Sequence, residues 1–431
     1  MKKKAVIIAT VIFVVALVSF YGSIPAVGAR DKVKLELWTF VNTHARWFRS
    51  MAKDYKKEHP NFDLKVTEIA YEEMHNKLLV ALQTGIGAPD LADVEQGRFG
   101  DFIRGKIIPF VDLTDKLRKE GYLDELVASR EALYSWKERI YGIEHALCPV
   151  VLYYRRDILE NAGIEVPIQT WDDFIKAGQK ISTGKRKMIA LSPDLWPILM
   201  RQRGVGWFDA QGNLTADSPK AVETLQWIIN LRDKYGIASE APAGNVYNPA
   251  YYGALKEGAY ICHISADWYA GFLKDNVPEL SGKWGAMPLP YWKDDPYKRR
   301  TSCYGGTGDA ITYLSKHKQD AWEFQKCTML SVEGNVRRYL LTNLWPPLKP
   351  AWKDNRLYRE DPYFGGQILG KLFAELGPEV PPQHQSPYLS IFHSQAEQWQ
   401  STYWRQILDR KMTVKEAIEK ICKIVRQKMK R

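Results

Sequence analysis

The sequence has little cysteine: five residues in a chain of 431, each far from the next. So low a density excludes the disulfide scaffold of small secreted domains, and an odd number leaves at least one thiol unpaired or paired between chains. The spacing leaves open which cysteines pair. No Cys-x-x-Cys occurs and no two histidines stand at metal-motif spacing, so we expect no metal site and no cofactor.

Signatures of several enzyme classes are also missing. The chain contains no Gly-x-Ser-x-Gly, His-Glu-x-x-His or P-loop motif, so serine-hydrolase, zinc-protease and nucleotide-binding functions have no anchor in the sequence. Asp172 and Asp173 form an adjacent carboxylate pair. Neighbouring residues on a helix face apart, which argues against a catalytic pair there.

Long apolar runs are confined to the N-terminus. A basic start, Met1 to Lys4, precedes the apolar run from Ala5 to Phe20, and small residues follow at Ala26 to Ala29. This order predicts a signal peptide over residues 1–29 and export to the periplasm or the outer cell surface. An uncleaved membrane anchor is the alternative. No cysteine lies near the predicted cleavage site, so lipid attachment at a new N-terminal cysteine is not expected.

Positive charge exceeds negative charge, with a formal net charge of +11. Most basic residues are interleaved with acids, and no recognisable nucleic-acid module accompanies the short clusters at residues 185–187, 298–300 and 426–431. We therefore expect solvated surface and no nucleic-acid partner, while attraction toward an anionic ligand stays possible.

Strand and helix patterns alternate in the first hundred residues. Alternating apolar residues predict strands over 33–38 and 64–69, a buried run predicts a strand over 89–94, and helical spacing predicts helices over 47–58 and 74–83. This order predicts a parallel sheet covered by helices, an α/β fold. Such sheets bind ligands at the carboxyl ends of their strands, which here are residues 38–44 and 95–99.

Helix starts are marked clearly farther along the chain. Thr170 precedes two acids as an N-cap, Ser218-Pro219 opens a helix that runs to Tyr235, and Thr413 with Glu416 forms a capping box for a C-terminal helix.

A series of short motifs then carries a resemblance to a known family. They lie at residues 35–38, 59–66, 85–90, 105–110, 141–143, 152–159, 162–164, 170–173, 259–268, 287–290, 305–311 and 321–324. Each motif is weak alone, but their order and spacing resemble the extracellular solute-binding proteins of ABC importers, in the sugar-binding branch that includes maltose-binding protein.

The resemblance implies two α/β lobes joined by a hinge, with a sugar held between them. It places residues 30–147 and 303–343 in the first lobe and residues 148–302 and 344–431 in the second, with crossings near Pro149, Ser302 and Leu344. It further implies a monomer that is not an enzyme, and that delivers a sugar or oligosaccharide to membrane permease subunits.

Site residues carried over from the resemblance fall in several motifs. Glu95, Gln96 and Arg98 stand in the loop after a strand, where an acid contacts sugar hydroxyls. Asp194 and Trp196 belong to a Trp-Pro segment near the cleft. Asp267 and Trp268 end a stretch with a stacking tryptophan, and Tyr304, Gly305 and Gly306 resemble a loop near the hinge.

Two further groups complete the expected site. Trp38, Asn42 and His44 follow the first strand, at a strand end that faces the cleft. His145 stands where the family approaches its hinge, although Glu144 replaces the proline common before it, and Cys148 falls where relatives carry a polar sugar contact. For each tryptophan, packing in the core is the competing interpretation.

Two other functions stay open. The first is an exported carbohydrate-active enzyme, which would need two opposed carboxylates about 5 to 9 Å apart. A solute-binding protein for a peptide, polyamine or anion is the second alternative. The positive charge makes an acidic saccharide the sugar variant to test.

Overall fold

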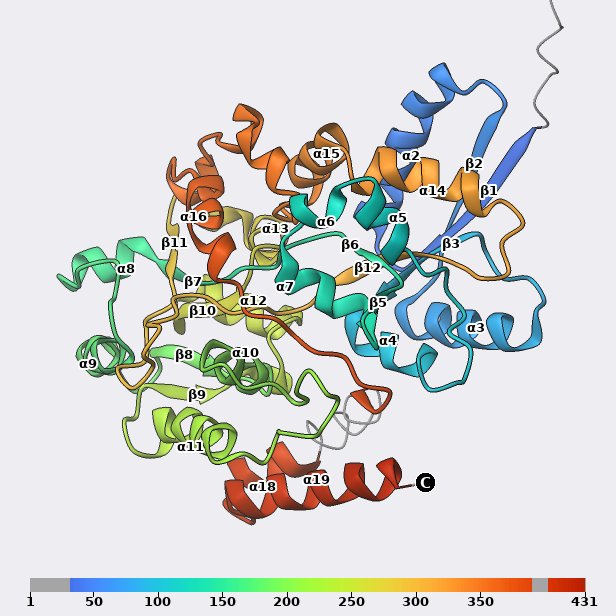
Figure 1. Ribbon diagram of the computed structural model, residues 1–431. Helices are drawn as coiled ribbons and strands as arrows, with labels where there is room; N and C mark the ends of the chain where they lie inside the picture. The colour runs from blue at the N-terminus through green and yellow to red at the C-terminus, as the bar shows by residue number, and fades with distance from the viewer. Residues whose placement is uncertain (1–31, 390–401, 431) are drawn as a thin grey trace, which may run out of the picture.

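The computed structural model describes residues 32–389 and 402–430 (Figure 1). The predicted signal peptide, residues 1–29, lies outside the described residues. Two five-stranded sheets, each flanked by helices, organise the chain into two lobes. The predicted α/β fold with two lobes is confirmed.

The first sheet has the strand order β2-β1-β3-β12-β6. Its strands are β1 (Val33–Thr39), β2 (Phe62–Glu68), β3 (Leu91–Glu95), β6 (Ile143–Glu144) and β12 (Thr307–Ile311). The strand β1 pairs in parallel with β2 and β3, whereas β12 runs antiparallel to β3 and β6. The carboxyl ends of β1 and β3 therefore meet at one edge, which faces the second lobe.

Helices cover both faces of this sheet. They are α2 (Asn42–Glu58), α3 (Tyr71–Thr84), α4 (Gln96–Phe102), α5 (Thr114–Lys119), α6 (Tyr122–Glu125), α7 (Ala128–Glu131), α14 (Lys318–Met329) and α15 (Val332–Thr342), with the 3-10 turn η1 (Ala132–Tyr134) and the hairpin of β4 (Ser135–Trp136) and β5 (Arg139–Ile140). Along β1, Leu35 and Leu37 enter the core beside α2 and α14, whereas Trp38 enters the opposite core beside α3. Side chains on opposite faces of β1 thus pack into two different hydrophobic cores.

The second sheet has the order β11-β7-β10-β8-β9. Its strands are β7 (Val150–Arg155), β8 (Lys187–Leu191), β9 (Ala238–Glu240), β10 (Tyr260–Ala266) and β11 (Trp284–Pro288). All residues of β7 and β10 are buried, because helices pack on both faces of these central strands.

The helices of the second lobe are α8 (Arg156–Asn161), α9 (Trp171–Ile181), α10 (Leu195–Gln202), α11 (Pro219–Asp233), α12 (Pro249–Lys256), α13 (Tyr269–Asn276), α16 (Leu369–Leu376), α18 (Trp404–Leu408) and α19 (Val414–Met429). The 3-10 turns are η2 (Pro242–Gly244), η3 (Pro278–Leu280), η4 (Lys349–Lys353), η5 (Asn355–Leu357), η6 (Pro362–Phe364) and η7 (Gly377–Glu379).

Three predicted helix starts are confirmed, and two helices begin earlier than predicted, one of them at Tyr71 instead of Met74. Thr170 caps α9, Pro219 opens α11, and Thr413 with Glu416 forms the capping box of α19. The helix predicted over 47–58 begins earlier, at Asn42, because the extended backbone at Val41 turns directly into α2. Asn42 and His44 therefore lie in the first turn of a helix rather than in a loop.

The chain passes between the sheets three times. It leaves the first sheet after Glu144 and enters the second at Val150, and it returns between Pro288 and Thr307. These two passages lie side by side, joined by a β-bridge between Pro149 and Cys303. The third passage follows α15, which ends at Thr342.

A further segment, residues 380–389, links the two lobes without belonging to either sheet; we call it the strap. Gln385 Nε2 donates to the backbone oxygen of Gln96 at 3.0 Å, and Arg104 Nε donates to the backbone oxygen of Pro387 at 2.7 Å. Of the helices that follow, α19 packs on α11 in the second lobe and α18 packs on α19. The strap therefore leaves the second lobe to touch α4 of the first.

All five cysteines are free thiols, four of them buried. Among the described residues, no helix is both long and apolar enough to cross a membrane.

Candidate functional site

A cavity of about 420 Å³ lies between the two lobes, beside all three crossings. This volume falls in the range of about 300 to 1,000 Å³ typical of small-molecule pockets. Its lining from the first lobe includes Thr43, His44, Arg46, Glu95 and Thr307, and its lining from the second includes Trp268, Gly271, Phe272, Lys274 and Asp275; the crossings add residues 144–146, 148, 305, 306 and 341–344.

Trp268 forms an aromatic wall of this cavity. It follows β10, is half-buried, and its indole Nε1 donates to the backbone oxygen of Tyr304 at 3.1 Å. Phe272, one helical turn later, packs edge-on against it with ring centroids 5.5 Å apart. A Cβ atom at Gly305 would lie 3.2 Å from the indole nitrogen, so glycine allows this close approach.

Glu95 supplies a carboxylate from the other lobe. It ends β3 and caps α4 by accepting a hydrogen bond from the backbone N–H of Gly97 at 2.7 Å, and the hydroxyl of Tyr71 donates to it at 3.0 Å. The backbone N–H of Glu95 donates to Nε2 of His75, whose Nδ1 donates to the backbone oxygen of Tyr71. Burial raises the pKa of Glu95.

His44 and His145 hold a buried carboxylate between them at the cavity edge. His145 Nε2 lies 2.8 Å from one oxygen of Asp93, and His44 Nδ1 lies 3.1 Å from the other. Burial opposes the charged form of Asp93, but the two imidazoles outweigh it and hold the pKa of Asp93 below its ordinary value. Burial lowers the pKa of His145 to about 3, so its ring is neutral at pH 7.

This trio is close enough to hold a metal ion, since its candidate ligand atoms all lie within 4.8 Å of one another. The two imidazole rings, however, stack 4.2 Å apart with only 9° between their planes. Parallel rings direct their nitrogen lone pairs side by side, whereas a metal needs them to converge. The arrangement fits two N–H donors on one carboxylate better than a metal centre.

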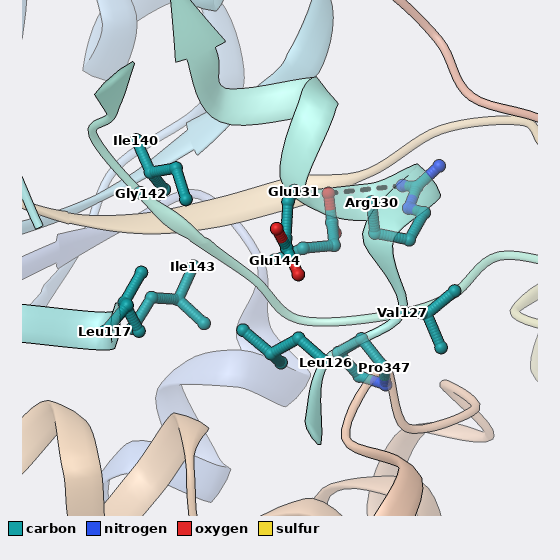
Figure 2. A pocket seen from close by; sticks show the side chains of 10 residues that line it. All are labelled: Leu117, Leu126, Val127, Arg130, Glu131, Ile140, Gly142, Ile143, Glu144 and Pro347. Atoms are coloured by element: carbon teal, nitrogen blue, oxygen red, sulfur yellow. Dashed lines mark ion pairs between the residues drawn. The ribbon is translucent and has the colours of Figure 1, made fainter. Parts of the chain in front are cut away.

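A buried ion pair fixes the first two crossings. Figure 2 shows Arg130 on α7 beside Glu144 on β6, with their ion pair of 3.1 Å drawn as a dashed line. The same carboxylate accepts the backbone N–H of Thr307 at 2.9 Å and of Ala146 at 3.3 Å. Burial raises the pKa of Glu144 to about 7, against the pull of Arg130. The adjoining pocket in Figure 2 has a volume of about 10 Å³, enough for one water at most.

Asp267 fixes the third crossing. One carboxylate oxygen accepts the backbone N–H of Trp268 at 2.8 Å and the other accepts that of Trp345 at 2.6 Å. The side chain is fully buried, and burial raises its pKa to about 7. Asp267 thus ties the aromatic wall to the third passage without lining the cavity itself.

The cavity brings together six of the residues expected from sequence: His44, Glu95, His145, Trp268, Gly305 and Gly306. The other eight expected residues lie outside its lining: Trp38, Asn42, Gln96, Arg98, Asp194, Trp196, Asp267 and Tyr304.

Two of these eight are core tryptophans. Trp38 is 3% exposed, its indole donates to Glu36, and Lys77 covers its ring. Trp196 is fully buried in α10 and donates to the backbone oxygen of Ala221 at 2.9 Å. Trp38 has its side chain on the α3 face of the sheet, although its backbone stands near a cleft-facing strand end.

Polar partners explain three others. Asn42 is exposed and donates to Glu68 at 3.1 Å. Arg98 pairs with Glu72 at 2.6 Å and with Asp101 at 3.1 Å. Gln96 is buried beneath the strap, where its side-chain oxygen accepts a hydrogen bond from Gln383.

Tyr304 and Asp194 form a bridge behind the aromatic wall. The hydroxyl of Tyr304 donates to Asp194 at 2.5 Å, and the Tyr304 ring packs 6.1 Å from Trp268. Burial raises the pKa of Asp194. The pair anchors the second crossing to the start of α10.

Several lining residues were not expected from the sequence, and one group carried a usable signal. Trp268, Gly271, Phe272 and Asp275 stand at positions i, i+3, i+4 and i+7, the spacing of one helix face. Because α13 begins at Tyr269, this face looks into the cavity. A helix extended from the expected stacking tryptophan would have found Phe272 and Asp275.

Comparison with known proteins places the chain in a family. A family model described as bacterial extracellular solute-binding protein matches residues 42–327. Arabinooligosaccharide-binding proteins are similar in sequence: that of Halalkalibacterium halodurans is 32% identical over 398 residues, covering 90% of this chain and 87% of the relative. That of Bacillus subtilis is 33% identical over 344 residues, 78% of each chain.

Solved structures share the fold. The sugar-binding protein MalE from Xanthomonas citri superposes with a TM-score of 0.75 at 17% identity, covering 91% of this chain and 96% of that one. An ABC transporter associated binding protein from B. animalis subsp. lactis, in complex with beta-1,6-galactobiose, gives a TM-score of 0.71 at 18% identity, covering 92% and 97%. With the family model spanning most of the described chain, this protein belongs to the bacterial extracellular solute-binding proteins.

Proposed function

We propose that this chain is the substrate-binding component of an ABC importer, and that it captures an arabinose-containing oligosaccharide in the cavity between its lobes. It then delivers this ligand to the permease subunits of the importer. The observation that carries the proposal is the cavity itself, in which a half-buried indole faces carboxylate, imidazole and backbone groups. The names of the two arabinooligosaccharide-binding relatives support the choice of sugar.

The chemistry of the lining suits a sugar. A sugar ring presents an apolar C–H face and a rim of hydroxyls. The Trp268 ring covers the face, while Glu95 and Asp275 accept hydrogen bonds from the rim and Lys274 donates to it. These groups come from both lobes, so contact with one ligand favours closure of the lobes around it.

We also propose lobe boundaries, with residues 30–147 and 303–343 in the first lobe and residues 148–302 and 344–431 in the second. The three passages of the chain between the sheets support this division. We further propose that residues 1–29 are a cleaved signal peptide and that the mature protein acts outside the cytoplasmic membrane as a monomer.

The test is a panel of ligands measured by thermal shift and calorimetry. Arabinobiose and arabinotriose should raise the melting temperature, because a ligand that binds only the folded state stabilises it by mass action. A ligand at 100 times its Kd contributes about 2.7 kcal/mol. If peptides or polyamines stabilise the protein and no saccharide does, the sugar assignment is wrong.

The proposed role is binding without turnover. Incubation with arabinooligosaccharides should release no reducing sugar, and recovered ligand should have its original length. Catalytic release of shorter sugars would instead identify a carbohydrate-active enzyme.

A further inference from the structure

Arg201 is a buried cation without an anionic partner. It lies on α10, is 3% exposed, and donates from Nη1 to the backbone oxygen of Cys303 at 3.1 Å. Its Nε is buried and has no acceptor, and no carboxylate of the described chain forms an ion pair with it. Burial lowers the pKa of Arg201, which shows how poorly its charge is compensated.

Other buried arginines of this lobe are paired. Arg203, the C-cap residue of the same helix, meets Asp294 at 2.6 Å, and Arg155 meets Asp157 at 2.7 Å. Buried charges in proteins are normally paired, because removing an ion from water costs several kcal/mol. An unpaired guanidinium therefore points to a partner that arrives from outside.

Arg201 borders a second cavity, of about 610 Å³, on the strap side of the second lobe. Its walls include Gly204, Phe208 and Ser218 from the lobe and Pro381 and His384 from the strap. The Ser218 hydroxyl is buried and has no hydrogen-bond partner. Burial lowers the pKa of His384, so it is neutral at pH 7 and can donate one hydrogen bond.

The other charged groups of this cavity are already engaged. Asp209 accepts hydrogen bonds from the backbone N–H groups of Gln211 and Asn213, and Arg299 pairs with Asp295 at 2.9 Å. Glu379 lies exposed at the rim. Among the charged side chains that line this cavity, Arg201 therefore keeps a buried donor, Nε, without an acceptor.

We propose that this second cavity binds the carboxylate of an acidic oligosaccharide, with Arg201 as its cationic partner and Ser218 as a neighbouring donor. A guanidinium matches the planar geometry of a carboxylate, and such charge-assisted hydrogen bonds are about twice as strong as neutral ones. The inference rests on the proposed sugar-binding function. It refines the substrate class from neutral sugars to sugars carrying a uronic acid.

The position of the cavity supports a role in the same binding event. Cys303, which accepts the hydrogen bond from Arg201, lies two residues before Gly305 in the inter-lobe cavity. Both cavities therefore border the same crossing of the chain, and Arg201 contacts that crossing directly.

The test compares saccharides of equal length with and without carboxylates. Digalacturonate and galactobiose are titrated at pH 7 and low salt into wild type, Arg201→Gln, Arg201→Lys and the control Arg203→Gln, which removes a paired cation from the same helix. We expect wild type to prefer digalacturonate by about tenfold or more, from a charged hydrogen bond. Arg201→Gln should abolish that preference, Arg201→Lys should keep part of it, and Arg203→Gln should leave it unchanged.

A readout on the ligand-free protein keeps the test independent of activity. Since Arg201 is an uncompensated buried charge, Arg201→Gln should leave the melting temperature unchanged or raise it. A variant that melts at a lower temperature would show that Arg201 serves the fold, and would overturn the inference.

The remaining outcomes separate the two proposals. Equal loss of both saccharides in Arg201→Gln would mean that Arg201 binds hydroxyls, so the acidic assignment fails while sugar binding stands. If acetate stabilises wild type as much as digalacturonate does, the site binds any free carboxylate, and the assignment to an acidic saccharide is wrong. If neither these two saccharides nor arabinotriose binds wild type, the proposed function itself fails; if arabinotriose binds and digalacturonate does not, only the acidic assignment fails.

Discussion

His75 contributes to the acid sensitivity of the fold beside the inter-lobe cavity. His75 is fully buried, and its two ring nitrogens serve the backbone of Glu95 and of Tyr71 in opposite roles. Protonation would replace the acceptor at Nε2 by a second donor, and the bond from the Glu95 backbone would be lost. Burial accordingly lowers the pKa of His75 to about 4.

This predicts a stability change with a definite sign. Unfolded chain binds the proton on His75 below about pH 6.5 and the folded protein only below about 4. The stability that depends on neutral His75 is therefore fully present above pH 6.5 and is lost as the pH falls to 4. The free energy of unfolding should fall by about 3 kcal/mol over this range for one such histidine. Urea unfolding at pH 7 and pH 4.5 should show that the free energy of unfolding falls less between these pH values in His75→Gln than in wild type. An equal loss in both would contradict the assignment.

Trp268 carries the other prediction at this scale. Because its partly exposed indole lines the cavity, Trp268→Ala should weaken oligosaccharide binding by about 2 kcal/mol, or roughly 30-fold, as for an aromatic anchor at an interface. Unfolding of the ligand-free variant should stay cooperative. Trp352→Ala is the matched control, since that half-buried indole donates to the backbone of Pro346 and is not part of the cavity lining; calorimetry should find its affinity unchanged.

At the scale of elements, buried carboxylates hold the crossings together in addition to apolar packing. Glu144 accepts N–H groups from two passages and Asp267 from the third. Gly306 lies inside this clamp, where a Cβ atom would sit 2.5 Å from Arg130 and 2.8 Å from Glu144. Its φ of +148° is one that other residues rarely adopt.

Gly306→Ala should therefore be strongly destabilising. We expect a loss of about 2 kcal/mol or more, from the strained backbone and from displacement of the Arg130–Glu144 pair. Gly253→Ala is the control, since this position lies in α12 with open space around it and alanine favours a helix. Chemical denaturation of the two variants should move in opposite directions; similar midpoints would refute the clamp.

Features that depend on residues within one element can be predicted from the sequence. Thr170, Pro219 and Thr413 mark helix starts because capping depends on residues a turn apart. It places strand ends at the cleft through topology, which finds Glu95 and the neighbourhood of His44. It does not find which face a strand-end side chain takes: Trp38 lies in a core because its partner helix α3 covers that side.

Contacts between segments that are far apart in the chain cannot be predicted from local sequence patterns. Asp267 bonds to Trp345 and Gln96 lies beneath Gln385, pairs that are far apart in the chain. No periodicity records such neighbours. The same limit hides the lone charge of Arg201, because the absence of a partner is a property of the folded molecule.

For the molecule as a whole, the strap adds a contact between the lobes besides the three crossings. Gln383 and Gln385 are buried against Gln96 of the other lobe. Any motion that separates the lobes on this side must break these hydrogen bonds or carry the strap along. The contacts favour the closed arrangement before ligand arrives.

Removing them should open the ligand-free protein. We expect the double variant Gln383→Ala/Gln385→Ala to show a larger radius of gyration in X-ray scattering without ligand, and the wild-type value with saturating ligand. Its affinity should fall in proportion to the lost closed population. Lys371→Ala, on α16 outside the strap, is the control. An unchanged radius in the double variant would show that the strap does not restrain the lobes.

The five unpaired thiols have a practical consequence. A fold that closes no disulfide needs no oxidative maturation, so it assembles equally in a reducing or an oxidising compartment. Four of the thiols are buried and only Cys327 is half-exposed. With Cys327→Ser, one cysteine added near Asn343 at the cavity rim would take a single fluorophore, and the protein would become an optical sensor for the solute it carries.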